Sequence, residues 1–179
     1  MNNVTTKKRV AAMLMSFILL VLPVMQIVLA GGVAYATPET KVWTDITKSG
    51  GFWNPYGVAL GGDGTLYVTD RDSNKIKKMP SGGNAWQDIT NAGGFDNPNG
   101  IAVGSDGTVY VSDGRNKKIK KLSSGGSAWQ DIPNEQLYEF NIPTGIAVGS
   151  DGTLYVADPG YNQIKKRSSG GSAWEYVTC

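Results

Sequence analysis

A repeat with a period of 43 to 45 residues runs through most of this chain. Each period carries one tryptophan, at Trp43, Trp86, Trp129 and Trp174. The segments between them are nearly identical over residues 54–70, 97–113 and 142–158. A period of about 20–50 residues is typical of folds in which each repeat is one supersecondary unit that buries its apolar surface against its neighbours. The chain is therefore expected to form an array of similar units.

Each period is expected to contain four short strands. The first reads Gly-(Val/Ile)-Ala-(Leu/Val), and the Asp-Gly pairs at 63–64, 106–107 and 151–152 predict a hairpin with a type I′ turn after it. The second strand, Thr-(Leu/Val)-Tyr-Val, is rich in β-branched and aromatic residues. The third is centred on Ile76, Ile119 or Ile164, and a Ser-Gly-Gly turn leads to the tryptophan strand. Four antiparallel strands in about 43 residues match one β-propeller blade.

The phrase Pro-x-Gly-Ile-Ala-Val-x-x-Asp-Gly-Thr-x-Tyr-Val-x-Asp, followed by Asn-x-Ile-x-Lys, resembles the NHL repeat family. The resemblance occurs three times and covers residues 41–179. It implies an all-β propeller of four-stranded antiparallel blades, commonly six in that family. We expect an outer strand at 41–47, followed by repeats at about 48–90, 91–133 and 134–179. The fold alone says little about activity, because propellers host many unrelated functions.

The N-terminal 36 residues have the pattern of a secretory signal peptide. Lys7, Lys8 and Arg9 precede an apolar run over 10–30, and Ala34-Tyr35-Ala36 follows. We predict cleavage between Ala36 and Thr37, a short linker at 37–40, and a secreted, extracellular or cell-wall-associated protein. The alternative is a retained membrane anchor, because the run approaches the ~20 residues that span a bilayer. The membrane is otherwise not an expected partner.

Charge and composition exclude several classes of function. Removing residues 1–36 leaves 14 basic and 15 acidic side chains, so the basic character belongs to the export signal and nucleic acid is not an expected partner. Histidine is absent, which removes the commonest general base and neutral metal ligand. We expect no metal and no cofactor. The single cysteine, Cys179, allows no internal disulfide, although it could pair with another chain.

Three blades do not close a ring, because propellers usually have about four to eight. An arc would leave an apolar sheet face at each end, and monomers rarely expose such patches. The strand at 41–47 is also surplus, since residues 174–178 already supply the outer strand of the last blade. Either the chain is the front part of a longer reading frame, or two or more arcs assemble. We expect residues 37–179 to self-associate through the open blade faces.

Variable loops on one face of the array are the candidate binding site. The loop that leads into each blade and the turn after its second strand are expected at the same end, and they differ between repeats. Binding residues concentrate on loops that a rigid scaffold positions. We select the aromatic and arginine residues there, with ordinary solvent-facing residues as the alternative for each: Trp53, Tyr56, Arg71, Arg115, Tyr138 and Tyr161.

Residues that recur in every repeat are interpreted as structural. One tryptophan per blade at the same position favours packing between blades over an aromatic binding platform. Asp70, Asp113 and Asp158 resemble metal ligands, but each begins a turn, where aspartate commonly accepts its own downstream backbone N–H. The Asp-Gly carboxylates are interpreted in the same way.

A basic set recurs on the third strands, near the Ser-Gly-Gly turns. Its members are Lys77, Lys78, Lys120, Lys121, Lys165, Lys166 and Arg167. We expect these side chains to face solvent along one rim. They either keep the strand soluble and discourage edge pairing, or form a basic surface for an anionic polymer.

These observations favour an extracellular binding or scaffold module that is not an enzyme, with an unknown protein or a cell-wall polysaccharide as partner. The alternative is a fragment of a lactonase- or lyase-like propeller enzyme whose catalytic residues lie in missing blades. Such enzymes need convergent carboxylates, amides or histidines near the axis. The expected inner strands carry only Gly, Ala, Val, Ile and Leu.

Overall fold

The structure, a computed structural model, describes residues 44–47, 50–133 and 140–177. The chain divides into two compact units, Met1–Thr44 and Asp45–Cys179, and the second contains every strand of the described residues. The predicted signal peptide, its cleavage site, the linker, Tyr138 and Cys179 lie outside the described residues. Within them, no helix is long and apolar enough to cross a membrane.

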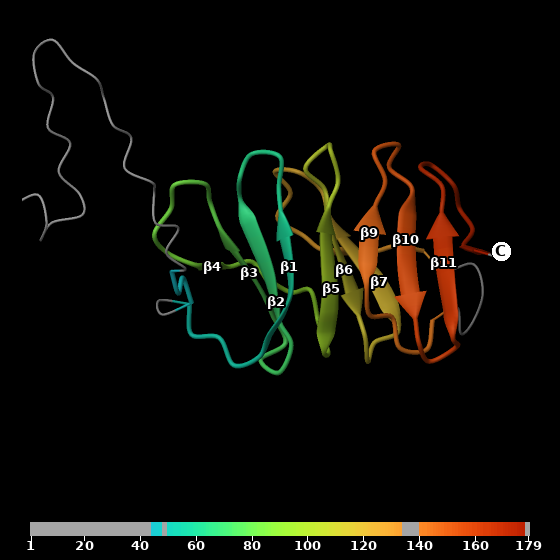
Figure 1. Cartoon of the computed structure of the whole chain (residues 1–179), viewed down its shortest axis with the longest axis horizontal. Helices are drawn as coiled ribbons and strands as arrows, with labels where there is room; N and C mark the ends of the chain where they lie inside the picture. Colours follow the sequence, from blue (N-terminus) through green and yellow to red (C-terminus); the bar gives the residue numbers. More distant parts are fainter. Residues whose placement is uncertain (1–43, 48–49, 134–139, 178–179) are drawn as a thin grey trace, which may run out of the picture. The chain divides into compact units, whose positions relative to one another are not determined.

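The second unit contains three four-stranded antiparallel sheets, which confirms the all-β prediction (Figure 1). The first sheet consists of β1 (Pro55–Leu60), β2 (Leu66–Asp70), β3 (Lys75–Met79) and β4 (Gln87–Asp88). The second consists of β5 (Pro98–Val103), β6 (Val109–Asp113), β7 (Lys118–Leu122) and β8 (Gln130–Asp131). The third consists of β9 (Ile146–Val148), β10 (Leu154–Asp158), β11 (Gln163–Arg167) and β12 (Glu175–Tyr176). In each sheet the strands pair in chain order.

The Asp-Gly hairpins differ from the predicted type I′ turn. Gly64 N–H donates to the Gly61 carbonyl at 2.9 Å, and Gly64 has a φ of 79°, whereas Asp63 is not in the positive-φ region. A type I′ turn needs positive φ at both central residues. The Asp63 carboxylate instead accepts the backbone N–H and the hydroxyl of Thr65, both at 2.9 Å. The hairpin is therefore a tight turn followed by a left-handed glycine, and the aspartate has the predicted turn-forming role.

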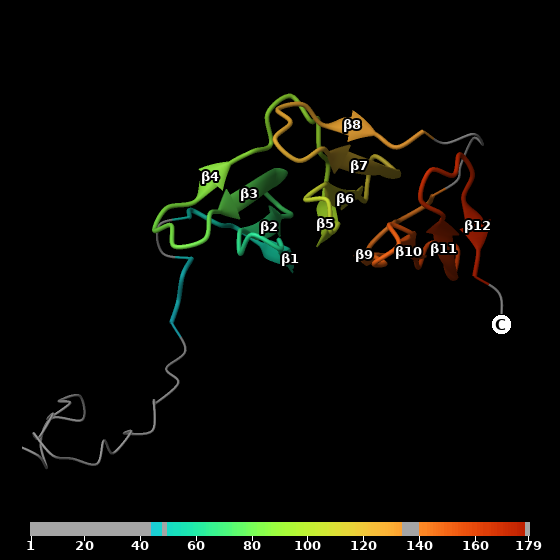
Figure 2. The same cartoon turned by 90° about the horizontal axis from the view of Figure 1, so that it is seen from above.

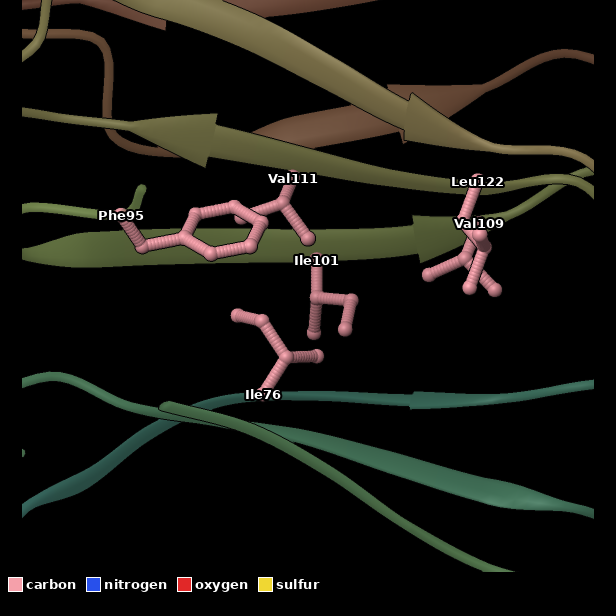
Figure 3. Packing of buried hydrophobic residues seen from close by; sticks show 6 residues of the cluster. All are labelled: Ile76, Phe95, Ile101, Val109, Val111 and Leu122. Atoms are coloured by element: carbon pink, nitrogen blue, oxygen red, sulfur yellow. The ribbon is translucent and has the colours of Figure 1, made fainter. Parts of the chain in front are cut away.

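The three sheets pack face to face, with β1, β5 and β9 along one side of the array and β4, β8 and β12 along the other (Figure 2). Ile76 from the first sheet lies in one apolar cluster with residues of the second repeat, shown in Figure 3: Phe95, Ile101, Val109, Val111 and Leu122. An equivalent cluster joins the second and third sheets, and it contains Ile119, Ile132, Phe140, Leu154 and Val156. The core of this unit thus lies between sheets.

Inner strands of neighbouring sheets approach closely at a glycine. Gly100 N–H on β5 donates to the Thr144 carbonyl of the next repeat at 2.8 Å. A Cβ at Gly100 would lie 2.3 Å from that carbonyl oxygen, so any side chain would force the sheets apart. This contact requires the glycine of the inner strand, and Gly57 approaches the Asn99 carbonyl in the same way.

Two of the tryptophans, Trp129 and Trp174, pack between sheets as predicted. Trp129 and Trp174 contact the two core clusters, each edge-on to a phenylalanine ring at 5.0 Å. Trp129 Nε1 also donates to the Ile89 carbonyl of the preceding repeat at 2.8 Å. Trp86 contacts Phe52 in the same way at 4.9 Å. Trp43 is not among the described residues.

Candidate functional site

Each sheet has one end at which the loop leading into it meets the turn after its second strand. Arg71 N–H donates to the Asn54 carbonyl at 2.9 Å, and Gly114 N–H donates to Asn97 at 3.1 Å. In the third sheet Asn141 Nδ2 donates to the Gly160 carbonyl at 3.0 Å. We call this end, formed by residues 50–54, 71–74, 94–97, 114–117, 140–142 and 159–162, the loop face; it lies at the lower edge of the sheets in Figure 1. The predicted grouping of variable loops is confirmed.

A buried aspartate fixes the lead-in loop of every sheet. Asp70, Asp113 and Asp158 end their strands and are 0% exposed. Asp70 accepts the backbone N–H of Asn54 at 2.8 Å, and Asp158 accepts that of Ile142 at 2.8 Å. The prediction that these carboxylates bond their own downstream backbone was wrong. They reach residues 16 or 17 positions upstream, because the lead-in loop has backbone donors that burial would otherwise leave without acceptors.

The pKa values of two of these aspartates move in opposite directions. Burial raises the pKa of Asp70, but hydrogen bonds from Ser73, Asn54 and Trp53 outweigh it and hold the pKa below its ordinary value. For Asp113, burial prevails over the hydrogen bond from Asn116, and the pKa is raised. In the described residues, no group of three or more Cys, Asp or Glu side chains is placed to hold a metal ion. The aspartates thus act within the scaffold.

The predicted solvent-facing basic rim does not form, because adjacent strand residues point to opposite faces of a sheet. Lys77, Lys120 and Lys165 are only 6%, 8% and 3% exposed. Their ammonium groups lie beneath the lead-in loops, within 4.4, 5.7 and 4.9 Å of the centroids of a phenylalanine ring in the same repeat.

The other members of the set are half-buried: Lys78, Lys121, Lys166 and Arg167. Arg167 donates to the backbone carbonyls of Gly171 at 2.8 Å and Pro133 at 2.7 Å, so it joins two loops. The two faces of a sheet contact different neighbours in the array. The seven basic side chains are therefore divided between a buried group beneath the lead-in loops and a half-buried group that contains the rest, and they do not form one continuous surface.

Tyr56, Arg71 and Asn97 form a cluster that joins the first and second repeats on the loop face. The Arg71 guanidinium carbon lies 5.0 Å from the centroid of the Tyr56 ring. Arg71 Nε donates to Asn97 Oδ1 at 3.1 Å, and Asn97 N–H donates to Asn74 Oδ1 at 2.8 Å. The two terminal guanidinium nitrogens have no hydrogen-bond partner in the described part of the chain. This fixed fork can bind a carboxylate or another oxygen-rich group.

The remaining candidates are dispersed along the loop face. Trp53 is 83% exposed, although its backbone N–H is held by Asp70 at 3.1 Å. Arg115 forms an exposed ion pair with Asp96 at 3.8 Å. Tyr161 is 40% exposed, with the Lys165 ammonium 5.0 Å from its ring centroid.

Sequence reasoning missed Asn74 and Asn97, which hold the Arg71 side chain in place. Both have positive φ, 56° and 55°, which asparagine tolerates better than most residues. The available signal was the Asn-Pro pair at 54–55 and 97–98, which Ile142-Pro143 replaces in the third repeat. This difference between repeats could have drawn attention to Asn97.

Comparisons with known proteins agree with this architecture. The family model for the NHL repeat matches residues 95–122 and 140–164. A nidogen/laminin complex has a TM-score of 0.61 at 21% identity, covering 69% of this chain and 48% of the matched one. Virginiamycin B lyase from Staphylococcus aureus has a TM-score of 0.55 at 20% identity, covering 69% and 41%. A streptogramin B lyase has a TM-score of 0.55 at 22% identity, and the match covers 69% of this chain and 40% of the lyase.

The chain spans less than half the length of each of these solved structures, and identities this low show the fold alone. No curated protein matches the sequence. The first sheet has the same strand order as the other two but lies outside the segments that the family model matches. Residues 95–122 and 140–164, which contain most of the second and third sheets, thus match the NHL repeat, and the chain has the fold of β-propeller blades.

Proposed function

We propose that the chain is an exported binding module whose loop face binds a cell-wall polysaccharide. The observation that carries this proposal is Trp53, a large aromatic side chain that is 83% exposed on a backbone fixed by Asp70. A rigid, exposed aromatic ring offers a broad contact surface at little cost in conformational entropy. Sugar rings present flat apolar faces that match such a ring.

Polar side chains beside Trp53 support the same ligand class. Asn54 Nδ2 donates to Asp72 Oδ2 at 3.1 Å, and both residues lie on the loop face. Arg71, held by Tyr56 and Asn97, adds a positioned fork of donors. Hydroxyl and carboxyl groups of a polysaccharide are suited to amide, carboxylate and guanidinium partners.

Co-sedimentation with purified peptidoglycan, with and without its attached anionic polymer, tests the proposal. We expect the full chain to sediment with the polysaccharide, and Trp53→Ala to weaken binding about tenfold or more, as for an aromatic contact at the centre of an interface. Arg71→Ala should weaken it as well.

Asn84→Ala is the control, because Asn84 is exposed and lies in the turn between β3 and β4, at the end of the first sheet opposite the loop face. It should bind as the unmodified chain does. Binding that requires the anionic polymer and ignores Trp53, or no binding to either preparation, would contradict the proposal.

A lyase-like activity is the second candidate, because two lyases of the streptogramin class share the fold. The described part of the inner strands β1, β5 and β9 carries no histidine or carboxylate. A solved structure of virginiamycin B lyase contains quinupristin, and we expect quinupristin to be recovered intact after incubation with this protein. A chemically altered product detected by mass spectrometry would favour the enzyme.

A further inference from the structure

Each sheet has two chemically different packing faces. The leading face packs against the preceding sheet, and in the second sheet it includes Ile101, Val103, Val109 and Val111. The trailing face packs against the following sheet, and in the first sheet it includes Ala59, Tyr67, Ile76 and Ile89. The array contains two interfaces between neighbouring sheets, which we call joints. At each joint a trailing face packs against a leading face.

Residues at these joints are almost fully buried. Ile76 and Ile119 occupy the same position on the trailing faces of the first two sheets and are 0% and 1% exposed. On the leading faces, Ile101 is 6% exposed, and Val111 and Val156 are 0% exposed. The joints are therefore closely packed apolar interfaces.

The leading face of the first sheet has the same residue types but is open. Val58, the counterpart of Ile101, is 66% exposed, and Leu60, the counterpart of Val103, is 67% exposed. A hollow of about 280 Å³ lies against this face, lined by Phe52, Val58, Leu66, Val68 and Trp86 together with Ile46.

The trailing face of the third sheet is open in the same way. Ile164, the counterpart of Ile76 and Ile119, is 53% exposed. Tyr155, the counterpart of Tyr67 and Tyr110, is 41% exposed. The unit thus ends in the two complementary halves of a joint that it already contains twice.

We propose that two copies of this chain associate head to tail, with the trailing face of the third sheet of one copy packed on the leading face of the first sheet of the other. The partner is a second copy because each open face presents the residue types of its buried counterparts, so the new joint continues the internal ones. Two copies bring six sheets together, within the range of about four to eight blades that closed propellers have. Both open faces are then covered if the ring closes.

Residues 45–47 mark the place of the incoming sheet. Trp86 Nε1 donates to the Ile46 carbonyl at 2.8 Å, just as Trp129 Nε1 donates to that of Ile89. Thr47 N–H donates to Asp45 at 2.9 Å, as Thr90 N–H does to Asp88. This segment therefore reproduces the last strand of a preceding blade.

In the dimer, the outer position of the third sheet of one copy can hold only one strand. Residues 45–47 of the second copy therefore replace β12 of the first copy at this position. β12 is the weaker strand, because Tyr176 stands where β4 and β8 have Asp88 and Asp131. Those aspartates form ion pairs with Lys75 at 3.0 Å and with Lys120 at 2.6 Å.

One residue makes the joint between copies weaker than the internal joints. Thr69 Oγ1 donates to the Asn99 carbonyl of the next sheet at 2.6 Å, and Ser112 Oγ donates to that of Thr144. Ala157 has the same position in the third sheet and lacks the hydroxyl. The missing donor would face the carbonyl of Tyr56 in the second copy.

Analytical ultracentrifugation of the exported protein tests the proposal. We expect concentration-dependent dimers. Leu60→Glu and Ile164→Glu should each weaken association about 100-fold or more, because each buries an unpaired charge at the joint. An equimolar mixture of the two variants should restore a 1:1 complex, since one leading face and one trailing face remain intact. Ala157→Ser should tighten the dimer.

Ser105→Glu, in an exposed turn, is the charge-matched control and should dimerise normally. Circular dichroism checks that the variants fold, as expected for substitutions at exposed positions. A chain that stays monomeric at all concentrations overturns the proposal. Association that is retained in both glutamate variants would also overturn it, because it would indicate contact through the N-terminal apolar segment. A mixture of the two variants that stays monomeric would overturn it as well.

Discussion

Replacing Lys165 by methionine should destabilise the protein far more than the same change at its neighbour Lys166. Lys165 is 3% exposed, and its ammonium lies 3.6 Å from Asp158, which is 0% exposed. The rings of Phe140, Tyr161 and Tyr176 surround it at 4.9, 5.0 and 5.7 Å. Methionine keeps most of the length and apolar contact of the side chain but removes the charge.

The size of the effect follows from these contacts. Removing one partner of a buried ion pair costs about 3–5 kcal/mol. Asp158 keeps hydrogen bonds from Asn141 N–H at 2.9 Å and Ile142 N–H at 2.8 Å, so we expect the lower end, about 3 kcal/mol. For a unit of this size the midpoint of thermal unfolding should fall by roughly 10 °C. Lys166 forms an exposed pair with Glu175 at 3.3 Å, and its loss should cost less than about 1 kcal/mol.

Urea unfolding followed by tryptophan fluorescence measures both variants, since Trp174 packs against Phe140. A double-mutant cycle with Asp158→Asn adds a sharper test, because the double variant should lose less stability than the sum of the single changes. Equal, small losses for Lys165→Met and Lys166→Met would refute the inference that Lys165 is held in a buried ion pair.

Three further predictions concern packing, acid stability and export. Gly100→Ala should destabilise by about 1–3 kcal/mol because its Cβ would meet the Thr144 carbonyl, whereas Gly62→Ala, with no atom within 4 Å, should be close to neutral in the same urea assay. Hydrogen bonds outweigh burial and hold the pKa values of Asp70, Asp88 and Asp131 below their ordinary value. The stability that these three carboxylates contribute is therefore present near neutral pH and should be lost as the pH falls through the lowered pKa values. Asp113 has a raised pKa, so its contribution to stability increases as the pH falls and offsets part of this loss. Urea-unfolding midpoints that increase as the pH is lowered from 5 to 3 would contradict the expected net loss of stability. Cleavage between Ala36 and Thr37 should give a secreted protein whose intact mass begins at Thr37, while a cell-associated product that retains Met1 would identify an anchor.

The repeat predicted the scaffold well because each strand and turn depends on local sequence. Period-two alternation in segments such as Thr-Leu-Tyr-Val and the Asp-Gly pairs is repeated three times, so the strand order could be read directly. The environment of Lys77 could not be inferred in this way. Its burial depends on the loop at 50–52, which covers the face of the strand opposite Ile76.

The candidate site was predicted only in part, because its contacts cross repeats. Arg71 and Trp53 could be selected as unusual loop residues, but the hydrogen bond from Arg71 to Asn97 joins residues that are 26 positions apart. Asp70 likewise accepts from Trp53, 17 positions upstream. Such long-range partners follow from how the sheets stack, and no local pattern in the sequence specifies them.

Hydroxyl-radical footprinting of the protein, free and bound to purified peptidoglycan, tests most directly whether the loop face is the binding surface. Trp53 is 83% exposed, and Met79, at the end of β3 opposite the loop face, is partly exposed, so both should be oxidised readily in the free protein. In the bound protein we expect oxidation of Trp53 and Tyr56 to fall several-fold, while oxidation of Met79 changes little. Unchanged oxidation of Trp53 together with protection of Met79 would contradict the account.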